Sequence, residues 1–468
     1  MLIVLSDLHF ADSSSNSLVG HEYNHNLPPE VYTSFFNEIH EFIRDSEIKE
    51  IDLILAGDIF EITRDARWHK DHLRPYLHNH EIIEGSEAEA RILEIIDAIN
   101  RDERVNATLE VFRRLGEFFE KPVNIHFIPG NHDRLANASV SIRKRIQELL
   151  GLEANGALFD NEYIRSNNGN PRVLIRHGHE YDRQNFSIDL RSWSKIPLKI
   201  DKDYYDKPSL GDIVTTEIAA KLPLIFRDFY TDAAIVSRDE LLVIYQRLID
   251  FDNVRPSNAL VNFLFTTPGL NKREVWRIIE PVMVRLLDDL AFNPKIGPSL
   301  IDFGQIKGAS AMTLKSVLST RLWRFGLPLW VMKALLNPIS KKSKISSNLD
   351  IISREQCLHD DVSTIRCIVS GHTHNALVEL LKIENGVETY YINSGTFRNV
   401  ITSTPNMGDF GRLRSKARVL IFSPRERNPE YVRETGWSFD FNSRYGFGAP
   451  KETNRNEEIA LDNAVDEQ

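Results

Sequence analysis

Short apolar runs alternate with longer stretches in which apolar residues recur every three or four positions over the first 180 residues. The short runs are typical of buried strands and the longer ones of amphipathic helices. Because strands and helices follow one another in turn, the pattern predicts an α/β domain. The predicted strands are Leu2–Leu5, Ile51–Ala56, Val123–Pro129 and Val173–Arg176, and the predicted helices are Glu30–Ile43, Ala88–Ile99 and Ala107–Phe119.

The pattern changes near residue 181, where helical periodicity takes over until about residue 355. Strand-like runs then return at Ile365–Ser370, Thr389–Asn393 and Arg418–Phe422. We therefore predict one discontinuous α/β domain, residues 1–180 and 356–449, interrupted by a helical insert or cap of residues 181–355. Residues 450–468 are polar, acidic and free of aromatic residues, which predicts a disordered tail. The helices predicted in the insert are Asp212–Leu222, Arg238–Ile249, Lys272–Leu290 and Met312–Leu336.

Composition and charge argue against several classes of protein. The chain has 468 residues and a formal charge of −10, which argues against indiscriminate binding to nucleic acid. Its two cysteines, Cys357 and Cys367, have neither a zinc-site spacing nor a CxxC spacing. The N-terminus lacks the basic start and long apolar run of a signal peptide, and no apolar stretch is long enough to span a bilayer. We expect a cytoplasmic protein.

Polar clusters rich in histidine, aspartate and asparagine follow five of the predicted strands. Functional groups gather beyond the carboxyl ends of strands in α/β sheets, so these clusters are expected to meet in one place. A single Asp-x-His or Gly-Asp arises often by chance, whereas five clusters in this order, each after an apolar run, do not. The clusters are Asp7-Leu8-His9, Gly57-Asp58, Gly130-Asn131-His132-Asp133, His177-Gly178-His179 and Gly371-His372-Thr373-His374.

The spacing of these residues suits metal binding. Residues two apart in an extended segment point the same way, so Asp7 and His9 can hold one ion together. The same spacing lets His372 and His374 face the site from one side. Asp58 has two carboxylate oxygens and can therefore bridge two ions. Imidazole and oxygen ligands without sulfur suit manganese, iron, zinc or nickel.

Taken together, these motifs resemble those of the calcineurin-like metallophosphoesterases. The resemblance covers residues 1–180 and about 360–425. It implies a four-layer αββα sandwich of two mixed sheets with helices outside. It also implies two divalent metal ions, for which manganese is preferred here. The first would be held by Asp7, His9, Asp58 and His374, and the second by Asp58, Asn131, His177 and His372.

The resemblance also implies roles for residues that do not bind metal. A hydroxide activated by both ions would attack phosphorus in line. His132 would stabilise the transition state or protonate the leaving oxygen. Glu61 stands where relatives carry an acidic residue that orients this histidine. Asp133 and His179 are expected to support the ligands from outside, although His179 can equally be a simple turn residue.

Within the family, the stretches His177–Asp182 and Tyr391–Phe397 are closest to the branch that contains UDP-2,3-diacylglucosamine hydrolase. That enzyme carries arginine where His132 stands, and it lacks so large an insert. A lipid-precursor pyrophosphatase is therefore an alternative function rather than the leading one.

Two further features bear on the substrate. Arg134, two residues after His132, and Arg398 are expected close to the proposed site, and a guanidinium can hold a phosphate with two hydrogen bonds. Surface salt bridging explains them equally well. Residues 321–344 combine tryptophans with lysines and arginines. This segment either touches a membrane or lipid-like substrate, or packs on the core with a solvated basic edge.

Three functions remain open. The leading hypothesis is a metal-dependent hydrolase of phosphomonoesters or phosphodiesters. A metal-dependent nuclease uses the same motifs but would need a basic channel, for which an acidic chain gives no strong signal. An inactive binding module would have lost ligands, whereas every expected position is present in this chain.

Overall fold

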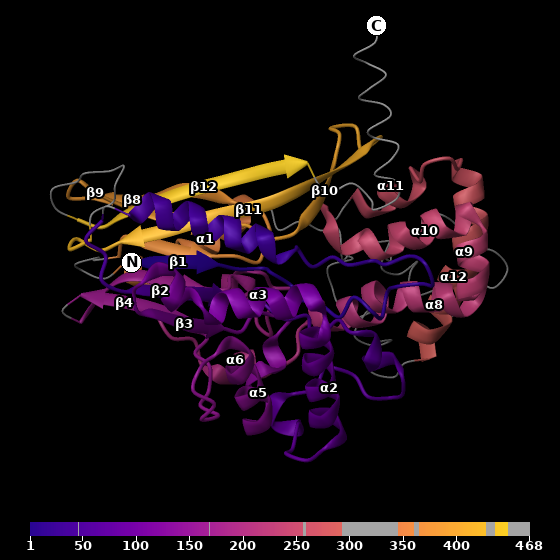
Figure 1. The fold of residues 1–468 in the computed structure, drawn as a ribbon, viewed down its shortest axis with the longest axis horizontal. Coiled ribbons are helices and arrows are strands. Elements are labelled where there is room, and N and C mark those ends of the chain that lie inside the picture. The colour runs from indigo at the N-terminus through magenta and orange to yellow at the C-terminus, as the bar shows by residue number, and fades with distance from the viewer. Residues whose placement is uncertain are drawn as a thin grey trace, which may run out of the picture.

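The computed structural model describes residues 1–44, 46–167, 169–255, 259–292, 345–359, 365–426 and 436–447. Its strands form two sheets (Figure 1). The larger sheet has the order β3-β2-β1-β11-β10-β6, and β12 also pairs with β11. Its strands are β1 (Leu2–Leu5), β2 (Ile51–Ala56), β3 (Val123–Ile128), β6 (Val254–Arg255), β10 (Asn399–Ser403), β11 (Phe410–Phe422) and β12 (Ser438–Phe447).

Because β1, β2 and β3 are parallel, the loops that follow them lie together at the carboxyl ends of these strands. Leu2 pairs with Asp52 and Ile51 with Val123, both in parallel register. On its other side β1 runs antiparallel to β11. The polar residues that follow the three parallel strands therefore emerge together.

The smaller sheet has the order β4-β5-β7-β9-β8. Its three central strands are parallel, with Val173 opposite Cys367 and Cys367 opposite Tyr390. The loops after β5 and β7 thus emerge side by side as well. The strands are β4 (Glu162–Asn167), β5 (Asn170–Arg176), β7 (Cys367–Ser370), β8 (Leu377–Glu384) and β9 (Val387–Asn393).

The two sheets pack face to face. Alternate residues of a strand point to opposite faces, so Leu2 and Val4 belong to the core between the sheets, where they meet Ile175 and Val369. Ile3 belongs instead to the core beneath the outer helices. Strands β1, β2 and β7 are buried on both faces, which is why they read as apolar runs in the sequence.

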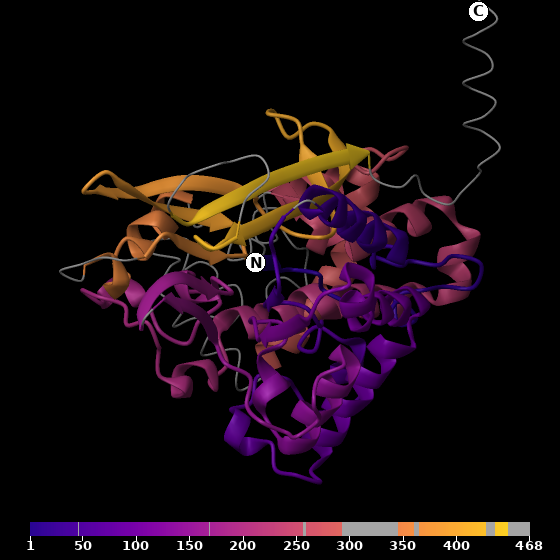
Figure 2. The same cartoon turned by 60° about the vertical axis from the view of Figure 1, so that its left-hand side comes forward.

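Helices cover the outer face of the larger sheet. They are α1 (Pro29–Ile43), α2 (Glu87–Arg101), α3 (Glu103–Arg113), α4 (Leu115–Phe119) and α5 (Val140–Leu150). In Figure 2 the C-terminal strands, orange to yellow, lie above these indigo and purple helices. The outer face of the smaller sheet packs against Tyr181, Phe186 and Ile352, in the segments before α6 (Lys202–Tyr205) and around α16 (Ile345–Ile352). The result is the predicted four-layer αββα sandwich.

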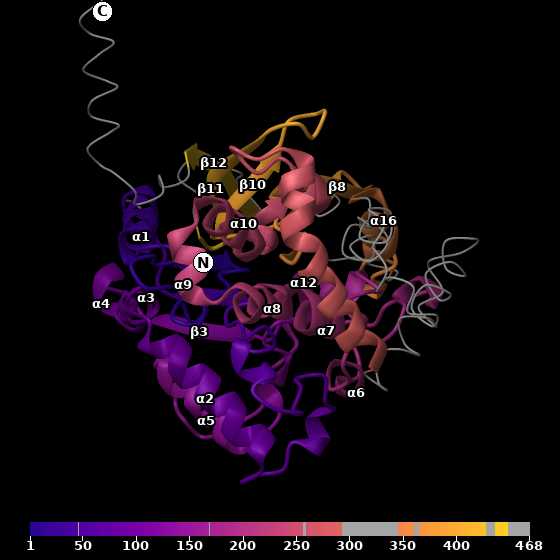
Figure 3. The same ribbon diagram turned by 90° about the vertical axis from the view of Figure 1, so that its right-hand side faces the viewer.

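The segment between the two parts of the sandwich is mostly helical and has an apolar core of its own. In Figure 1 helices α8 to α12 gather at the right-hand end of the molecule, and Figure 3 faces them. One short strand of this segment, β6, joins the larger sheet, because Val254 pairs in parallel with Ile401 of β10. The helices are α7 (Leu210–Val214), α8 (Lys221–Tyr230), α9 (Asp232–Ser237), α10 (Asp239–Ile249), α11 (Leu260–Phe265) and α12 (Lys272–Phe292).

Most predicted elements are confirmed, with differences at irregular points. The Ser86 hydroxyl accepts a hydrogen bond from the Glu89 amide and so caps α2. The helix predicted over Ala107–Phe119 divides into α3 and α4, because Arg114 leaves helical backbone angles. A π-helical segment, Thr215–Ala220, separates α7 from α8, where the sequence predicted one helix. In the described part of the chain, no helix has the length and apolarity to cross a bilayer.

Three predictions fall outside the described residues. They are the helix predicted at Met312–Leu336, the basic, tryptophan-containing segment 321–344 and the disordered tail from residue 450 onward.

Candidate metal centre

The five polar clusters converge at the carboxyl ends of β1, β2, β3, β5 and β7. The first three strands belong to the larger sheet and the last two to the smaller one. The candidate site therefore lies where the carboxyl ends of strands from the two sheets meet. Three groups of described side chains there bring their ligand atoms within 4.8 Å of one another, namely Asp7, His9 and His374; His9, Glu61 and His132; and Asp58, His177 and His372.

The first group surrounds the carboxylate of Asp7. Nε2 of His374 lies 3.3 Å from Asp7 Oδ1 and 2.9 Å from Nε2 of His9. The other carboxylate oxygen, Oδ2, accepts a hydrogen bond of 2.9 Å from the His372 amide. Burial opposes the charge on Asp7, but hydrogen bonds from His374 and His9 hold the pKa of this carboxyl far below its usual range. One carboxylate oxygen and two imidazole nitrogens thus face one another.

In the group of Asp58, His177 and His372, two hydrogen-bond acceptors face each other. Nδ1 of His177 lies 2.9 Å from the Ala56 carbonyl, which can only accept a hydrogen bond, so the proton is on Nδ1. The lone pair of Nε2 then faces Asp58 Oδ2 at 3.1 Å. A lone pair and a carboxylate at this distance need a cation between them, either a proton or a metal ion. Asp58 Oδ2 also lies 3.9 Å from His9 Nε2, so Asp58 is within reach of both groups.

Asn131 lies in the loop after β3, next to His132. Its Oδ1 is buried and has no hydrogen-bond partner within the described residues. Buried polar atoms are nearly always paired, and an unpaired one calls for an explanation such as an absent ion. The ligand atoms present, imidazole nitrogens with carboxylate and amide oxygens, suit first-row divalent ions.

The backbone at these positions is strained. Five of the seven predicted ligands have left-handed φ angles: Asp7 (54°), His9 (49°), Asp58 (54°), His372 (69°) and His374 (57°). Residues with side chains rarely adopt this region, and such strain concentrates at functional sites. The surrounding hydrogen bonds impose it, since the amides of Asp7 and His9 bond to the carbonyls of Gly57 and Asp58.

Two glycines make room for the ligands. A Cβ on Gly57 would overlap the His177 ring, and one on Gly130 would overlap the Asp58 carboxylate. Both glycines directly precede a predicted ligand in the sequence. Close approach of the backbone to a ligand side chain is therefore what requires glycine here.

Glu61 joins two histidines. Its Oε1 contacts Nδ1 of His9 and its Oε2 lies 3.1 Å from Nδ1 of His132. The His132 amide also donates a hydrogen bond of 2.8 Å to Asp58 Oδ1. Burial disfavours the imidazolium, yet the carboxylates of Glu61 and Asp58 outweigh it and raise the pKa of His132 to about 10.

Asp133 ties two of the loops together. Its Oδ2 accepts hydrogen bonds from the amides of Ile59 (2.7 Å) and Phe60 (3.2 Å), and its Oδ1 accepts one from Gly130. The loop after β3 is thereby fixed to the loop after β2. This contact gives Asp133 a supporting position beside Asp58 rather than a place in the ligand groups.

His179 is buried behind His177. The two ring centroids lie 5.3 Å apart, and the His179 ring also packs against Phe186 and Tyr205. Burial lowers the pKa of His179 to about 4, so the ring is neutral at neutral pH. Its packing is that of a support for His177.

The two predicted substrate-binding arginines differ in their surroundings. The Arg134 guanidinium is buried and donates hydrogen bonds to the carbonyls of Pro75, Leu77 and Asp206. These contacts favour a structural role for Arg134. Arg398 lies inside the site, with Nη1 at 3.8 Å from Glu61 Oε1.

Asp252 and Arg255, which sequence reasoning missed, reach the site from the helical segment. Asp252 Oδ2 accepts a hydrogen bond of 2.7 Å from Arg398 Nη1 and also pairs with Arg64. Arg255 Nη2 donates to Nδ1 of His374 over 2.7 Å. Both residues lie in or next to β6, a strand of two residues with no periodic signal in the sequence. The pairing of β6 with β10 holds this segment beside the site.

Comparison with known proteins agrees with this geometry. The family model described as calcineurin-like phosphoesterase matches residues 1–215. No curated protein matches the chain. The matched residues include the clusters after β1, β2, β3 and β5, which supply five of the seven predicted ligands and His132. Residues 1–215 therefore carry a calcineurin-like phosphoesterase domain.

Proposed function

We propose that this protein hydrolyses a phosphomonoester or phosphodiester with two divalent metal ions, manganese being preferred. Asp7, His9, Asp58 and His374 would hold the first ion, and Asp58, Asn131, His177 and His372 the second. The observation that carries the proposal is the 3.1 Å distance between His177 Nε2 and Asp58 Oδ2, a contact that requires a proton or a metal ion between the two atoms. The unpaired Oδ1 of Asn131 supports the same site.

Bound divalent ions would activate a water molecule and stabilise the phosphate oxygens. Side chains of the protein would position the ions, transfer the proton and bind the substrate. Asp58 reaches both ligand groups and would hold their spacing. His132, charged beside Glu61, would donate a proton to the leaving oxygen or stabilise the charge that develops there. Arg398, fixed by Asp252, would contact a phosphate oxygen of the substrate.

We also propose that residues 181–355 form an insert that completes the site rather than only covering it. Arg255 contacts His374, and Asp252 contacts Arg398 and Arg64. These contacts tie the insert to both a predicted metal ligand and a predicted substrate contact. Specificity for the substrate would then depend on the insert as well as on the sandwich.

An activity assay tests the proposal. Purified protein with Mn²⁺ is expected to hydrolyse p-nitrophenyl phosphate or bis(p-nitrophenyl) phosphate, with metal content measured on the same sample. Asp58→Asn should lower kcat at least a hundredfold because it removes a charge shared by both ions. The exposed Asp160→Asn serves as the matched control and should retain wild-type activity. Equal rates for Asp58→Asn and wild type on every ester cleaved would contradict the proposal.

A further inference from the structure

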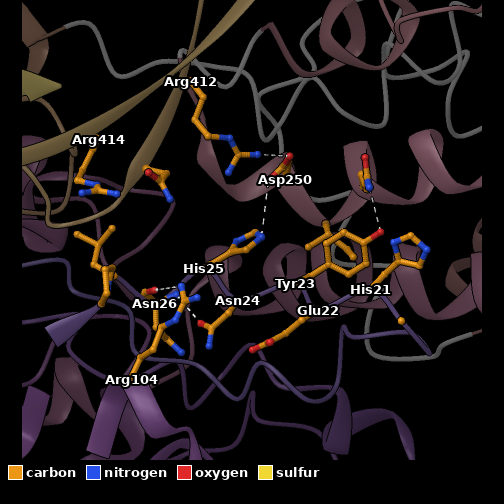
Figure 4. A pocket seen from close by; sticks show the side chains of 16 residues that line it. His21, Glu22, Tyr23, Asn24, His25, Asn26, Arg104, Asp250, Arg412 and Arg414 are labelled. Atoms are coloured by element: carbon orange, nitrogen blue, oxygen red, sulfur yellow. Dashed lines mark hydrogen bonds and ion pairs between the residues drawn. The ribbon is translucent and has the colours of Figure 1, made fainter. Parts of the chain in front are cut away.

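A polar cavity of about 480 Å³ opens between the loop of residues 20–28 and the strands β10 and β11. In Figure 4, Arg412 and Arg414 approach from β11 on one side, and residues 21–26 line the opposite side. Arg104, from the first turn of α3, completes the wall next to Asn26. The chain as a whole is acidic, so three arginines around one cavity are a local concentration of positive charge.

This cavity adjoins the candidate metal centre. A second, smaller cavity of about 60 Å³ is lined by Glu61, Arg64 and Arg398. The two cavities share lining residues and are therefore neighbours. The shared residues are Tyr23, His25, Asn26 and Ile249.

Acidic residues neutralise part of the charge in the larger cavity. Arg412 Nη2 bonds to Asp250 Oδ2 at 2.5 Å. Arg104 Nη1 donates to the Asn26 carbonyl at 3.2 Å, and Glu22 also lines the wall. Three guanidinium groups and two carboxylates thus line the cavity, so the formal charge of its lining is positive.

Two adjacent polar atoms in the wall lack partners. Arg414 on β11 and Asn399 on β10 pair in the sheet register. The Nε of Arg414 and the Oδ1 of Asn399 are both buried with no hydrogen-bond partner among the described residues. An unpaired buried donor on a charged group is costly, and an unpaired acceptor beside it is also unfavourable. Both atoms lie beneath the cavity surface, so a ligand that brings an anionic oxygen to Arg414 and a hydroxyl group to Asn399 would satisfy them once these side chains turn towards it.

We propose that the larger cavity binds a second phosphate of the substrate, carried on a hydroxyl-bearing group such as a sugar. This inference rests on the proposed phosphoesterase function, because the scissile phosphate would lie at the metal centre. Arg414 and Arg104 would contact the distant phosphate, and Asn399 would accept from a neighbouring hydroxyl. The substrate class is then a molecule with at least two phosphates, such as a nucleoside bisphosphate or a short oligonucleotide.

Inhibition measurements test the substrate class. Thymidine 3′,5′-bisphosphate and thymidine 5′-monophosphate are compared as inhibitors of whichever chromogenic ester the Mn²⁺-loaded protein cleaves. The bisphosphate should inhibit roughly tenfold more strongly, as expected for one charge-assisted contact. Arg414→Ala and Arg104→Ala should each bring this ratio towards one, whereas the exposed Arg238→Ala on the helical segment should keep it. Equal inhibition by both nucleotides in the wild type, or an unchanged ratio in both cavity variants, would overturn the inference.

A binding measurement separates this inference from the proposed function. Inorganic pyrophosphate is titrated by calorimetry into the full chain without added metal, with circular dichroism to check the fold of each variant. Arg414→Ala or Arg104→Ala should weaken binding roughly tenfold. If no phosphoester is cleaved but this dependence holds, the proposed function fails and the anion site stands. Pyrophosphate that does not bind, or binds both variants as it binds the wild type, overturns the site.

Discussion

Nδ1 of His132 lies 3.1 Å from Oε2 of Glu61, although 71 residues separate them in the sequence. Glu61 contacts His9 with its other carboxylate oxygen. One carboxylate thus positions both a predicted metal ligand and the predicted proton donor. The glutamate reaches His132 from the position where the family resemblance implied an orienting acidic residue.

Replacing Glu61 with glutamine should lower kcat roughly 10- to 100-fold, as is usual when a partner of a ligand histidine is lost. The cause is the loss of the charge that orients His132 and favours its protonated form. Steady-state kinetics with p-nitrophenyl phosphate, together with metal content, measure the effect. Glu117→Gln, at an exposed position of α4, is the control. A Glu61→Gln enzyme with wild-type kcat and metal content would disprove the orienting role.

Asp252→Asn should destabilise the protein and reduce activity together. The Asp252 carboxylate pairs with Arg64 and with the buried Arg398, so neutralising it removes the nearest anionic partner of Arg398 and an ion pair of Arg64. We expect a loss of about 2 kcal/mol in the free energy of unfolding, measured in urea. We also expect a higher KM, because Arg398 loses its fixed position. If Asp160→Asn and Asp252→Asn gave the same stability and KM, the contact between insert and site would have no energetic role.

Gly130→Ala should abolish activity and lower the thermal stability of the protein. The added Cβ would overlap both the carboxylate and the backbone nitrogen of Asp58, so the loop that carries Asp58 must shift away from its present contacts. The control is Gly116→Ala in α4, where a Cβ would meet the Lys121 carbonyl at an ordinary distance of 3.6 Å. Activity, metal content and thermal unfolding are measured for both. Full activity in Gly130→Ala would show that Asp58 does not need this placement.

His69 should make stability depend on pH. Burial, helped by the charges of Arg74 and Lys221, lowers the pKa of His69 to about 4 from its ordinary value of 6.5. The unfolded chain therefore binds the proton more tightly, so stability falls as the pH drops from 6.5 towards 4.

His69→Gln should flatten this part of the curve of unfolding free energy against pH, with His72→Gln at an exposed position as the control. An identical slope in wild type and His69→Gln would contradict the assignment.

The sequence sufficed for the sandwich and for the residues at its strand ends. Strands such as β1 and β2 are buried on both faces, and this burial leaves an apolar run that ends at a glycine or a polar cluster. The strands β4, β8, β10 and β12 were not predicted, because their exposed or mixed positions give no clear run. The local sequence pattern thus predicts fully buried strands well and strands with exposed positions poorly.

The rest of the site depends on tertiary contacts that no local pattern encodes. Arg255 reaches His374 only because two residues of β6 pair with β10. Arg134 was expected near a phosphate on account of its place beside His132, but its hydrogen bonds go to carbonyls of other loops. Distance along the chain is a poor guide to the direction of a long, flexible side chain.

The left-handed backbone at Asp7, Asp58 and His372 has a consequence for folding. Each of these residues follows a different strand, and the hydrogen bonds that hold such angles join separate loops. No one loop can keep its strained shape alone, so the site can form only after β1, β2 and β7 have found their places in two different sheets. A fragment that ended at residue 215 would lack β7, and with it His372 and His374. The ability to bind metal should therefore appear late, as a property of the completed sandwich.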